Sequence, residues 1–269
     1  NIQFAIKHEE GRQNVYVLEV NPRASRTVPF VSKAIGMPLA KIAATIMAGV
    51  SLAEQGYESA PIPSHVSIKE SVFPFVKFAG VDIVLGPEMR STGEVMGTSE
   101  RFSIAFAKSQ LAAGVLLPKS GTIFMSLSDR TKRHAVALGS KLTELDFQLI
   151  ATGGTAKLLL EAGINVRQVK KLQEGHPNLL DLLIDGQIQL IINTPSGKGA
   201  RTDEGRIRAA SVSHGVPCIT TIQAADAAVM AMEALRGEEM TVQALQDRLP
   251  QELSAGHTAD SRRVSYRAL

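Results

Sequence analysis

The sequence has a single cysteine, Cys218, among its 269 residues, and it has no tryptophan. One cysteine excludes an internal disulfide framework and a zinc site built from thiolates. No apolar run approaches the roughly 20 residues that a helix needs to cross a bilayer, so no membrane partner is predicted. The first residues also lack the basic and apolar segments of a signal peptide. We therefore expect a cytoplasmic protein, and the strand that begins directly after Asn1 indicates a fragment of a longer chain.

Charge and aromatic content are both low. Charged residues make up 20% of the chain, the net charge is +3, and aromatic residues contribute 4%. The basic residues are spread along the chain without interleaved aromatics, so nucleic acid is not a predicted partner, whereas anionic small molecules fit this mild positive charge. With 44% hydrophobic residues the chain can bury more than one core, which suggests one or two domains.

The first 26 residues carry the densest chemical pattern. Residues 2–7 and 15–21 alternate as two strands, joined by a polar turn that we expect near Gly11. An antiparallel register around that turn places Gln3 directly across from Glu19. The period of two then puts Asn21 on the same face as both side chains.

These three side chains carry oxygen atoms of the kind that Mg²⁺ and Mn²⁺ accept. Beyond them, Arg23 and Arg26 can hold the phosphate oxygens that such a metal bridges. Glu19 alone is best explained as part of an ordinary half-buried strand. The whole cluster is typical of phosphoryl transfer from a nucleotide, where catalysis is mostly positioning and charge neutralisation.

From about residue 115 the pattern changes to strands that alternate with helices. Such alternation predicts a parallel sheet with crossover helices, and therefore a Rossmann-like α/β domain. The predicted strands are 122–127, 147–151, 164–169, 188–193 and 217–221. The predicted helices are 131–145, 155–161, 178–184, 206–214 and 224–235.

Polar residues follow several of these strands, where open α/β sheets bind ligands. Residues 151–155 join a strand to a helix, Lys171 follows another strand, and residues 193–199 follow a third. Free amides at a helix start, hydroxyls and lysines together favour a phosphate site. Each loop alone is explained as well by an ordinary turn, with Thr152 and Thr155 as helix caps.

Two long blocks resemble a known family. Residues 19–34, which begin Glu-Val-Asn-Pro-Arg, and residues 85–97, which begin Leu-Gly-Pro-Glu-Met-Arg, are similar to the second ATP-grasp half of the carbamoyl-phosphate synthase large chain. The region after residue 115 resembles the methylglyoxal-synthase-like domain of the same chain. The resemblance implies residues 1–114 as the C-terminal part of an α+β ATP-grasp domain and residues 115–269 as a parallel α/β allosteric domain.

The resemblance implies an ATP-dependent ligase of pyrimidine and arginine biosynthesis. Members of the family make carbamoyl phosphate from bicarbonate, ammonia and two ATP, with ammonia released from glutamine by a glutaminase small chain. It implies ATP with Mg²⁺ or Mn²⁺ as cofactors. Gln3 and Glu19 would contact both ATP and metal, Asn21 would complete the metal ligands, and Arg23 and Arg26 would be catalytic. The fragment alone is expected to be inactive.

The resemblance also implies two effector sites. A nucleotide such as UMP or IMP would contact Lys132, Thr152, Thr155, Lys171, Asn193 and Ser196. An ornithine pocket would correspond to Glu70, Leu85 and Thr220. This chain departs from the family at Pro195, where enteric members have threonine, and at Cys218, where the ornithine pocket has tyrosine.

Two other functions fit parts of the pattern. The chain could be a stand-alone nucleotide-binding regulatory module, or its second domain could be a lyase of the methylglyoxal synthase type. The lyase family places its catalytic carboxylate in a Gly-Gly-Asp setting, whereas residues 196–203 here reach an aspartate only at Asp203. The sequence is compatible with a homo-oligomer and does not specify one.

Overall fold

The computed structural model describes residues 2–73, 83, 93–170, 172–195, 203–248 and 264–265. Contacts divide the chain into two compact units. One contains the residues up to Ser64 together with a segment that begins at Val242, and the other contains His65–Thr241. The division between the two units thus falls between Ser64 and His65. The domain boundary that the sequence predicts near residue 115 stays a prediction.

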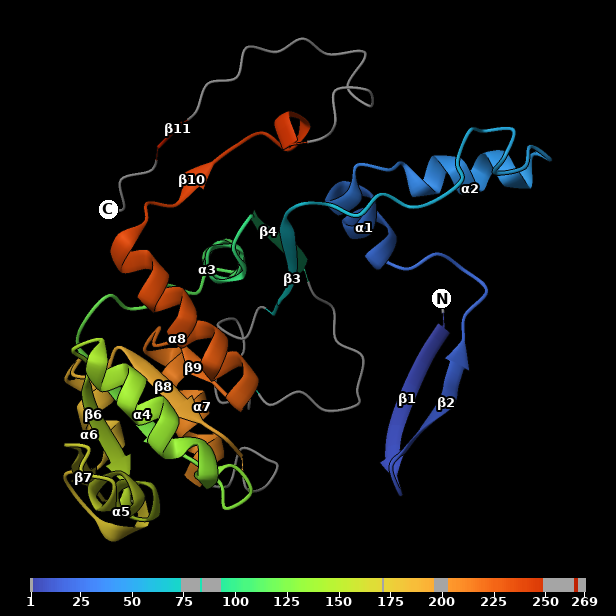
Figure 1. Cartoon of the computed structure of the whole chain (residues 1–269). Coiled ribbons are helices and arrows are strands. Elements are labelled where there is room, and N and C mark those ends of the chain that lie inside the picture. Colours follow the sequence, from blue (N-terminus) through green and yellow to red (C-terminus); the bar gives the residue numbers. More distant parts are fainter. Residues whose placement is uncertain are drawn as a thin grey trace. The chain divides into compact units, whose positions relative to one another are not determined.

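The first unit begins with a two-stranded antiparallel hairpin, seen at the blue end of the chain in Figure 1. Strand β1 is Ile2–Glu9 and strand β2 is Arg12–Val20. Glu10 and Gly11 form the turn with φ of 49° and 76°, the conformation of a type I′ turn that matches the twist of the strands. Two helices follow, α1 at Thr27–Ile35 and α2 at Leu39–Met47, and Gly36 ends α1 in the left-handed conformation.

The second unit is built on a five-stranded parallel sheet with the order β7-β6-β5-β8-β9. Its strands are β5 Thr122–Ser126, β6 Gln148–Thr152, β7 Arg167–Val169, β8 Leu190–Asn193 and β9 Cys218–Ile219. Its helices are α4 Ala135–Glu144, α5 Gly153–Glu161, α6 Leu179–Ile184, α7 Asp203–Ser213 and α8 Ile222–Gly237. The predicted parallel α/β sheet is therefore confirmed.

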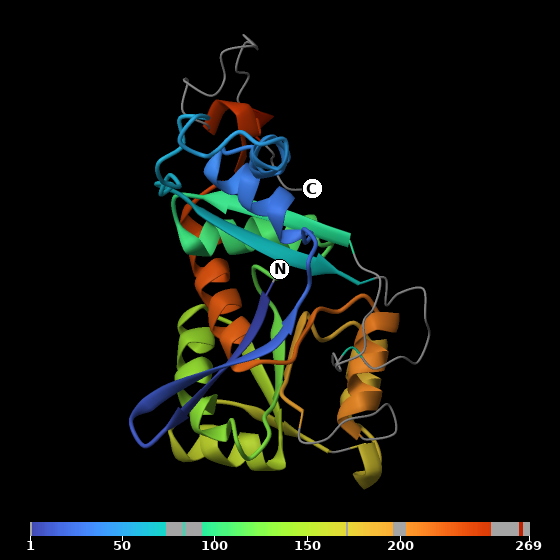
Figure 2. The same ribbon diagram turned by 90° about the vertical axis from the view of Figure 1, so that its right-hand side faces the viewer.

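Helices cover both faces of this sheet. Alternate residues of the central strands point to opposite sides, so Ile123 and Met125 of β5 pack with α4, α5 and α8, whereas Phe124 packs with α6 and α7. Figure 2 shows α4 and α7 on opposite sides of the strands. Because both faces are buried at the centre of the sheet, β5 and β8 are mostly apolar, as is typical of parallel sheets.

A second antiparallel pair lies in the same unit. Strands β3 (Val66–Val72) and β4 (Gly93–Ser99) pair with each other, and α3 (Phe102–Ala112) packs against them and against α8. Shorter described elements complete the chain: η2 Lys132–His134, η3 Leu172–Glu174, β10 Thr241–Val242, η4 Leu245–Arg248 and β11 Val264–Ser265.

None of the described helices is by itself long and apolar enough to cross a membrane. Helices α1 and α2 reach that length and hydropathy only as a pair, and their axes bend by 112°.

Candidate functional sites

The first candidate site lies where the strand order of the parallel sheet reverses. From β5 the chain adds β6 and β7 on one side of the sheet, and then crosses to add β8 and β9 on the other side. The position between β5 and β8, where this direction reverses, is the switch point. Ser126 and Asn193, at their carboxyl ends, are directly paired in the register. Open α/β sheets bind ligands in the crevice at this position.

Hydroxyl groups connect the loops around the switch point. The Ser126 and Thr152 hydroxyl oxygens lie 3.1 Å apart, and Thr155 Oγ1 accepts a hydrogen bond from the Leu127 amide at 3.1 Å. Thr152 stands at the N-cap of α5 but makes no capping hydrogen bond. The side chain of Thr152 therefore does not cap α5, and the alternative interpretation of this residue as an ordinary helix cap is wrong.

A second hydroxyl cluster joins the loop after β5 to the end of β8, and the sequence analysis did not identify it. The Thr131 and Thr194 hydroxyl oxygens are 2.7 Å apart, and Thr194 Oγ1 accepts a hydrogen bond from the Ser128 amide at 2.9 Å. Ser128 and Thr194 are buried. Isolated serines and threonines in loops are too common to signal such a cluster, which forms only when the two parallel strands pair.

Lys132 brings a positive charge to the start of α5. Its ammonium nitrogen lies 2.9 Å from the position that a Cβ atom would take at Gly154, in the first turn of that helix. Lys132 forms an ion pair with Asp129 across three residues, and its side chain is 30% exposed. A lysine in a first helical turn is usually solvated surface. Here the cation instead lies over a helix N-terminus, which favours anions.

Asn193 lies against a buried arginine that the sequence analysis also missed. Asn193 and Arg208 are both 0% exposed, and Arg208 Nη1 lies 3.4 Å from Asn193 Oδ1. The predicted helix near residues 206–214 is confirmed as α7, but helical spacing did not mark Arg208 as inward-facing. A fully buried arginine contradicts the usual preference of this residue for the surface.

Three predicted contacts lie outside the described residues. They are Lys171 and Ser196 of the nucleotide site and Leu85 of the ornithine pocket. The structure thus brings together Lys132, Thr152, Thr155 and Asn193 around the ends of β5, β6 and β8. Their role in binding a ligand remains a prediction.

The second candidate site is on the N-terminal hairpin. Gln3 and Glu19 are directly paired, as the alternation predicted, and Asn21 Nδ2 donates a hydrogen bond of 2.9 Å to Glu19 Oε1. The register shifts between Gln3 and Phe4, and such bulges commonly redirect side chains near active sites. Because the amide nitrogen of Asn21 donates to Glu19, the amide oxygen points away from this hydrogen bond. A metal ion would bind that oxygen, since the nitrogen cannot act as a ligand. The oxygen-rich set therefore suits Mg²⁺ or Mn²⁺.

The two arginines follow directly on this cluster. Arg23 donates from Nη1 to the Ala24 carbonyl oxygen at 3.3 Å, and Arg26 occupies the N-cap position of α1. Both side chains are exposed. Among the described residues, three or more His, Cys, Asp or Glu side chains do not gather anywhere as a metal cluster. The hairpin site contains a single carboxylate, Glu19, next to two amide side chains. Binding of a metal ion there stays a prediction.

Glu70 is the described acidic member of the predicted ornithine pocket. It lies on β3, and its Oε2 accepts a hydrogen bond of 2.9 Å from Gln110 Nε2 of α3. Burial raises the pKa of the Glu70 carboxyl, and the Gln110 hydrogen bond opposes this shift. Glu70 is therefore not a solvated strand residue. Thr220 follows β9 in the same unit, and no hydrogen bond between described residues links it to Glu70.

Replacing Glu70 by glutamine should stabilise the chain at pH 7. A raised pKa means that the folded state binds the proton more tightly than the unfolded state, so the stability contributed by Glu70 falls as pH rises above its unfolded pKa. The neutral amide removes that penalty. Thermal unfolding at pH 7 and pH 4 should show a higher Tm for the variant at pH 7 and a smaller difference at pH 4. An equal or lower Tm at pH 7 would contradict this assignment.

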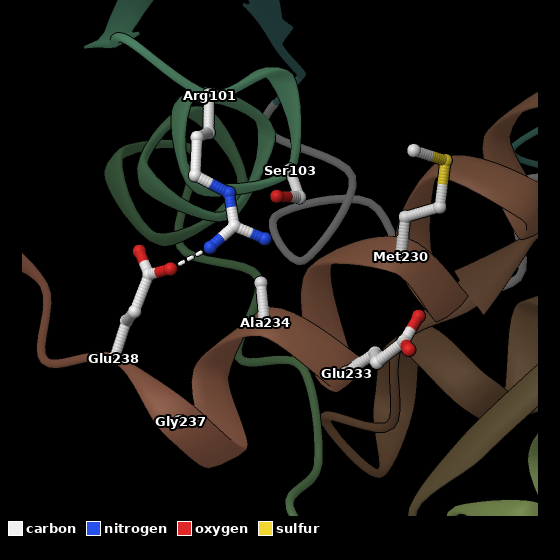
Figure 3. A pocket seen from close by; sticks show the side chains of 7 residues that line it. All are labelled: Arg101, Ser103, Met230, Glu233, Ala234, Gly237 and Glu238. Carbon is white, nitrogen blue, oxygen red and sulfur yellow. Dashed lines mark ion pairs between the residues drawn. The ribbon is translucent and has the colours of Figure 1, made fainter.

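A surface pocket of about 310 Å³ lies between α3 and α8 (Figure 3). Arg101, before α3, forms an ion pair with Glu238, which follows α8, and both side chains are partly exposed. Exposed pairs of this kind contribute about 0–1 kcal/mol. None of the predicted site residues lines the pocket, so we assign it no role. Its lining residues are Arg101, Ser103, Met230, Glu233, Ala234, Gly237 and Glu238.

Two family models match separate parts of the chain. The model described as "Carbamoyl-phosphate synthase L chain, ATP binding domain" matches residues 1–55, which contain the hairpin site. The model described as "MGS-like domain" matches residues 134–220, which contain most of the switch-point site. The chain therefore combines part of an ATP-binding domain with an MGS-like domain.

Relatives extend this similarity over nearly the whole chain. It is 66% identical to the carbamoyl phosphate synthase large chain of Rhodopirellula baltica and 52% identical to that of Myxococcus xanthus, over 93% of its length in each case. It is also 52% identical, over 92% of its length, to the arginine-specific large chain of rice chloroplasts. The chain belongs to the carbamoyl phosphate synthase large chain family. It spans 23%, 23% and 21% of the lengths of these relatives.

Proposed function

We propose that the chain contributes part of an ATP-dependent phosphorylation site and an allosteric nucleotide site to a carbamoyl phosphate synthase. The intact ligase would make carbamoyl phosphate for pyrimidine and arginine biosynthesis, with ammonia supplied by a glutaminase small chain. The observation that carries the catalytic part is the paired position of Gln3 and Glu19, with Asn21 bonded to the same carboxylate. The match of residues 1–55 to an ATP-binding domain supports it.

The hairpin side chains would act by position and charge. Gln3, Glu19 and Asn21 would hold Mg²⁺ or Mn²⁺, which neutralises phosphate charge when bound. Arg23 and Arg26 would bind the oxygens of carbamate or of the transferred phosphoryl group, because guanidinium groups pair with such oxygens in a bidentate way. The two arginines lie within seven positions of Glu19, so one short segment would present both functions.

The switch-point site would bind the phosphate of a nucleoside monophosphate such as UMP or IMP. Three features support this: the uncapped start of α5, the ammonium group of Lys132 beside it, and the hydroxyls of Thr152 and Thr155. A helix N-terminus and a lysine both favour a dianion over a neutral group. The base and ribose would extend toward Asn193 at the end of β8.

Replacing Lys132 by alanine should weaken UMP binding about tenfold, because a charge-assisted contact with a phosphate contributes roughly 1.5–3 kcal/mol. Binding of uridine, which lacks the phosphate, should not change. Calorimetric titration of the 269-residue chain with both ligands measures the difference. Lys157, exposed in the middle of α5, is the matched control, and its alanine variant should bind UMP as the wild type does. Equal UMP affinity in the Lys132 variant would refute the phosphate position.

We also propose an ornithine pocket at Glu70. A partly buried carboxylate with a raised pKa is poised to gain from an ammonium group, which would return that pKa toward its ordinary range. Glu70 and Thr220 are the described members of the pocket. Titration of the chain with ornithine tests the assignment: the wild type should bind ornithine, and the Glu70→Gln variant should not.

A further inference from the structure

Arg208 and Asn193 form a buried polar pair beside the switch point. Both residues are 0% exposed, although each carries a strongly polar side chain. The guanidinium Nη1 of Arg208, on α7, lies 3.4 Å from Oδ1 of Asn193, the last residue of β8. Arg208 is flanked on its helix by Ile207, which packs in the apolar core under the sheet. The pair therefore connects that core with the end of the strand.

The chemistry of arginine decides which way the Asn193 amide faces. A guanidinium group has five N–H donors and no acceptor, so only the amide oxygen of asparagine can bond to it. The amide nitrogen must then face away from Arg208. In the part of the chain that the structure describes, Asn193 Nδ2 is buried and has no hydrogen-bond partner. A buried donor without a partner is unfavourable and gains from any acceptor brought to it.

We propose that Arg208 is a positioning residue that acts through Asn193. It holds the amide so that the N–H₂ group offers donors, and only donors, to a ligand at the switch point. The inference rests on the proposed nucleotide site and narrows the ligand: the part that reaches Asn193 must present an acceptor oxygen, such as a carbonyl oxygen of a base or a phosphoryl oxygen. Because Nδ2 is buried, the atoms that cover it must shift before a ligand oxygen reaches it.

A purely structural role for Arg208 predicts something different. If the guanidinium only fills space between α7 and β8, its loss would lower stability and ligand affinity whatever residue stands at position 193. If it acts through the amide, its loss should have no further effect on affinity once that amide is absent. A double-mutant cycle separates the two cases.

The cycle uses Arg208→Gln, Asn193→Ala and the double variant, each in the 269-residue chain and titrated calorimetrically with UMP. We expect each single change to weaken binding about tenfold, or about 1.4 kcal/mol, and the double variant to bind no more weakly than Asn193→Ala. Losses that multiply to about a hundredfold overturn the inference. Arg206, exposed on the same helix, is the matched control, and Arg206→Gln should leave UMP affinity unchanged.

Asn193→Asp gives an independent test that does not depend on the folding of an Arg208 variant. Aspartate has the same shape and can accept from Arg208 but cannot donate, so Tm should equal or exceed that of the wild type. UMP affinity should fall at least tenfold. An Asn193→Asp chain that binds UMP as tightly as the wild type overturns the inference. A wild-type chain that binds neither UMP nor inorganic phosphate instead refutes the proposed nucleotide site.

Discussion

Replacing Glu19 by glutamine in an intact large chain that contains this sequence should abolish ATP formation from carbamoyl phosphate and ADP. Glu19 is the one carboxylate in the cluster with Gln3 and Asn21, and glutamine keeps its size while removing its charge. Loss of that charge would weaken the proposed metal binding and the neutralisation of phosphate charge, effects of several kcal/mol. The rate should fall about a thousandfold, because each 1.36 kcal/mol is a factor of ten.

Glu9→Gln is the matched control for that experiment. Glu9 pairs with Lys7 and lies beside the turn, at the opposite end of the hairpin from Glu19. The same carboxylate-to-amide change there should leave the rate within about twofold, because exposed ion pairs contribute little. Far-ultraviolet circular dichroism should show that both variants fold. A Glu19→Gln enzyme with the wild-type rate would remove Glu19 from the phosphorylation site.

Replacing Gly97 by alanine should destabilise the antiparallel layer of the second unit. A Cβ atom at Gly97, on β4, would overlap the Ala105 carbonyl oxygen and the Ser109 amide nitrogen, which belong to the backbone of α3. Backbone atoms cannot rotate away, so α3 must leave β4. We expect a loss of roughly 3 kcal/mol, at the upper end of overpacking effects. Tm should fall by roughly 6–12 °C for a unit of this size.

Gly93 provides the matched control on the same strand. A Cβ atom there would meet only the Cβ of Val72 at 3.5 Å, an ordinary contact distance. Gly93→Ala should therefore leave Tm within about 2 °C of the wild type. Differential scanning calorimetry of the two variants gives the comparison. If both melt alike, the close approach of α3 to β4 does not hold in solution.

For the N-terminal hairpin, local sequence predicted the register of the strands but not the burial of their side chains. The alternation of residues and a turn at Gly11 predicted the pairing of Gln3 with Glu19, because register follows from turn position and a period of two. The same pattern suggested half-buried strands. In the structure the apolar side chains are exposed, with Phe4 at 53% and Val17 at 59%. Burial depends on what packs against a strand, and its own sequence does not contain that information.

The parallel sheet was predicted for a related reason. Strands such as 122–127 and 188–193 are short apolar runs separated by helical patterns, and right-handed crossovers leave few topologies for such a chain. The structure trims these strands to β5 and β8 at their ends. Strand ends depend on the pairing of neighbours, so they were less accurately predicted than the strands themselves.

By itself, the sequence determined the local elements, the alternation that produces a parallel sheet, and the resemblance that the relatives confirmed. Only the tertiary structure decided which polar groups meet. Arg208 became a buried partner of Asn193, Lys132 came to lie over the start of α5, and Thr131 met Thr194 across 63 residues. Hydrophobic periodicity is a local property that repeats along the chain. Hydrogen bonds between distant residues depend on strand order and helix placement, which exist only once the sheet has formed.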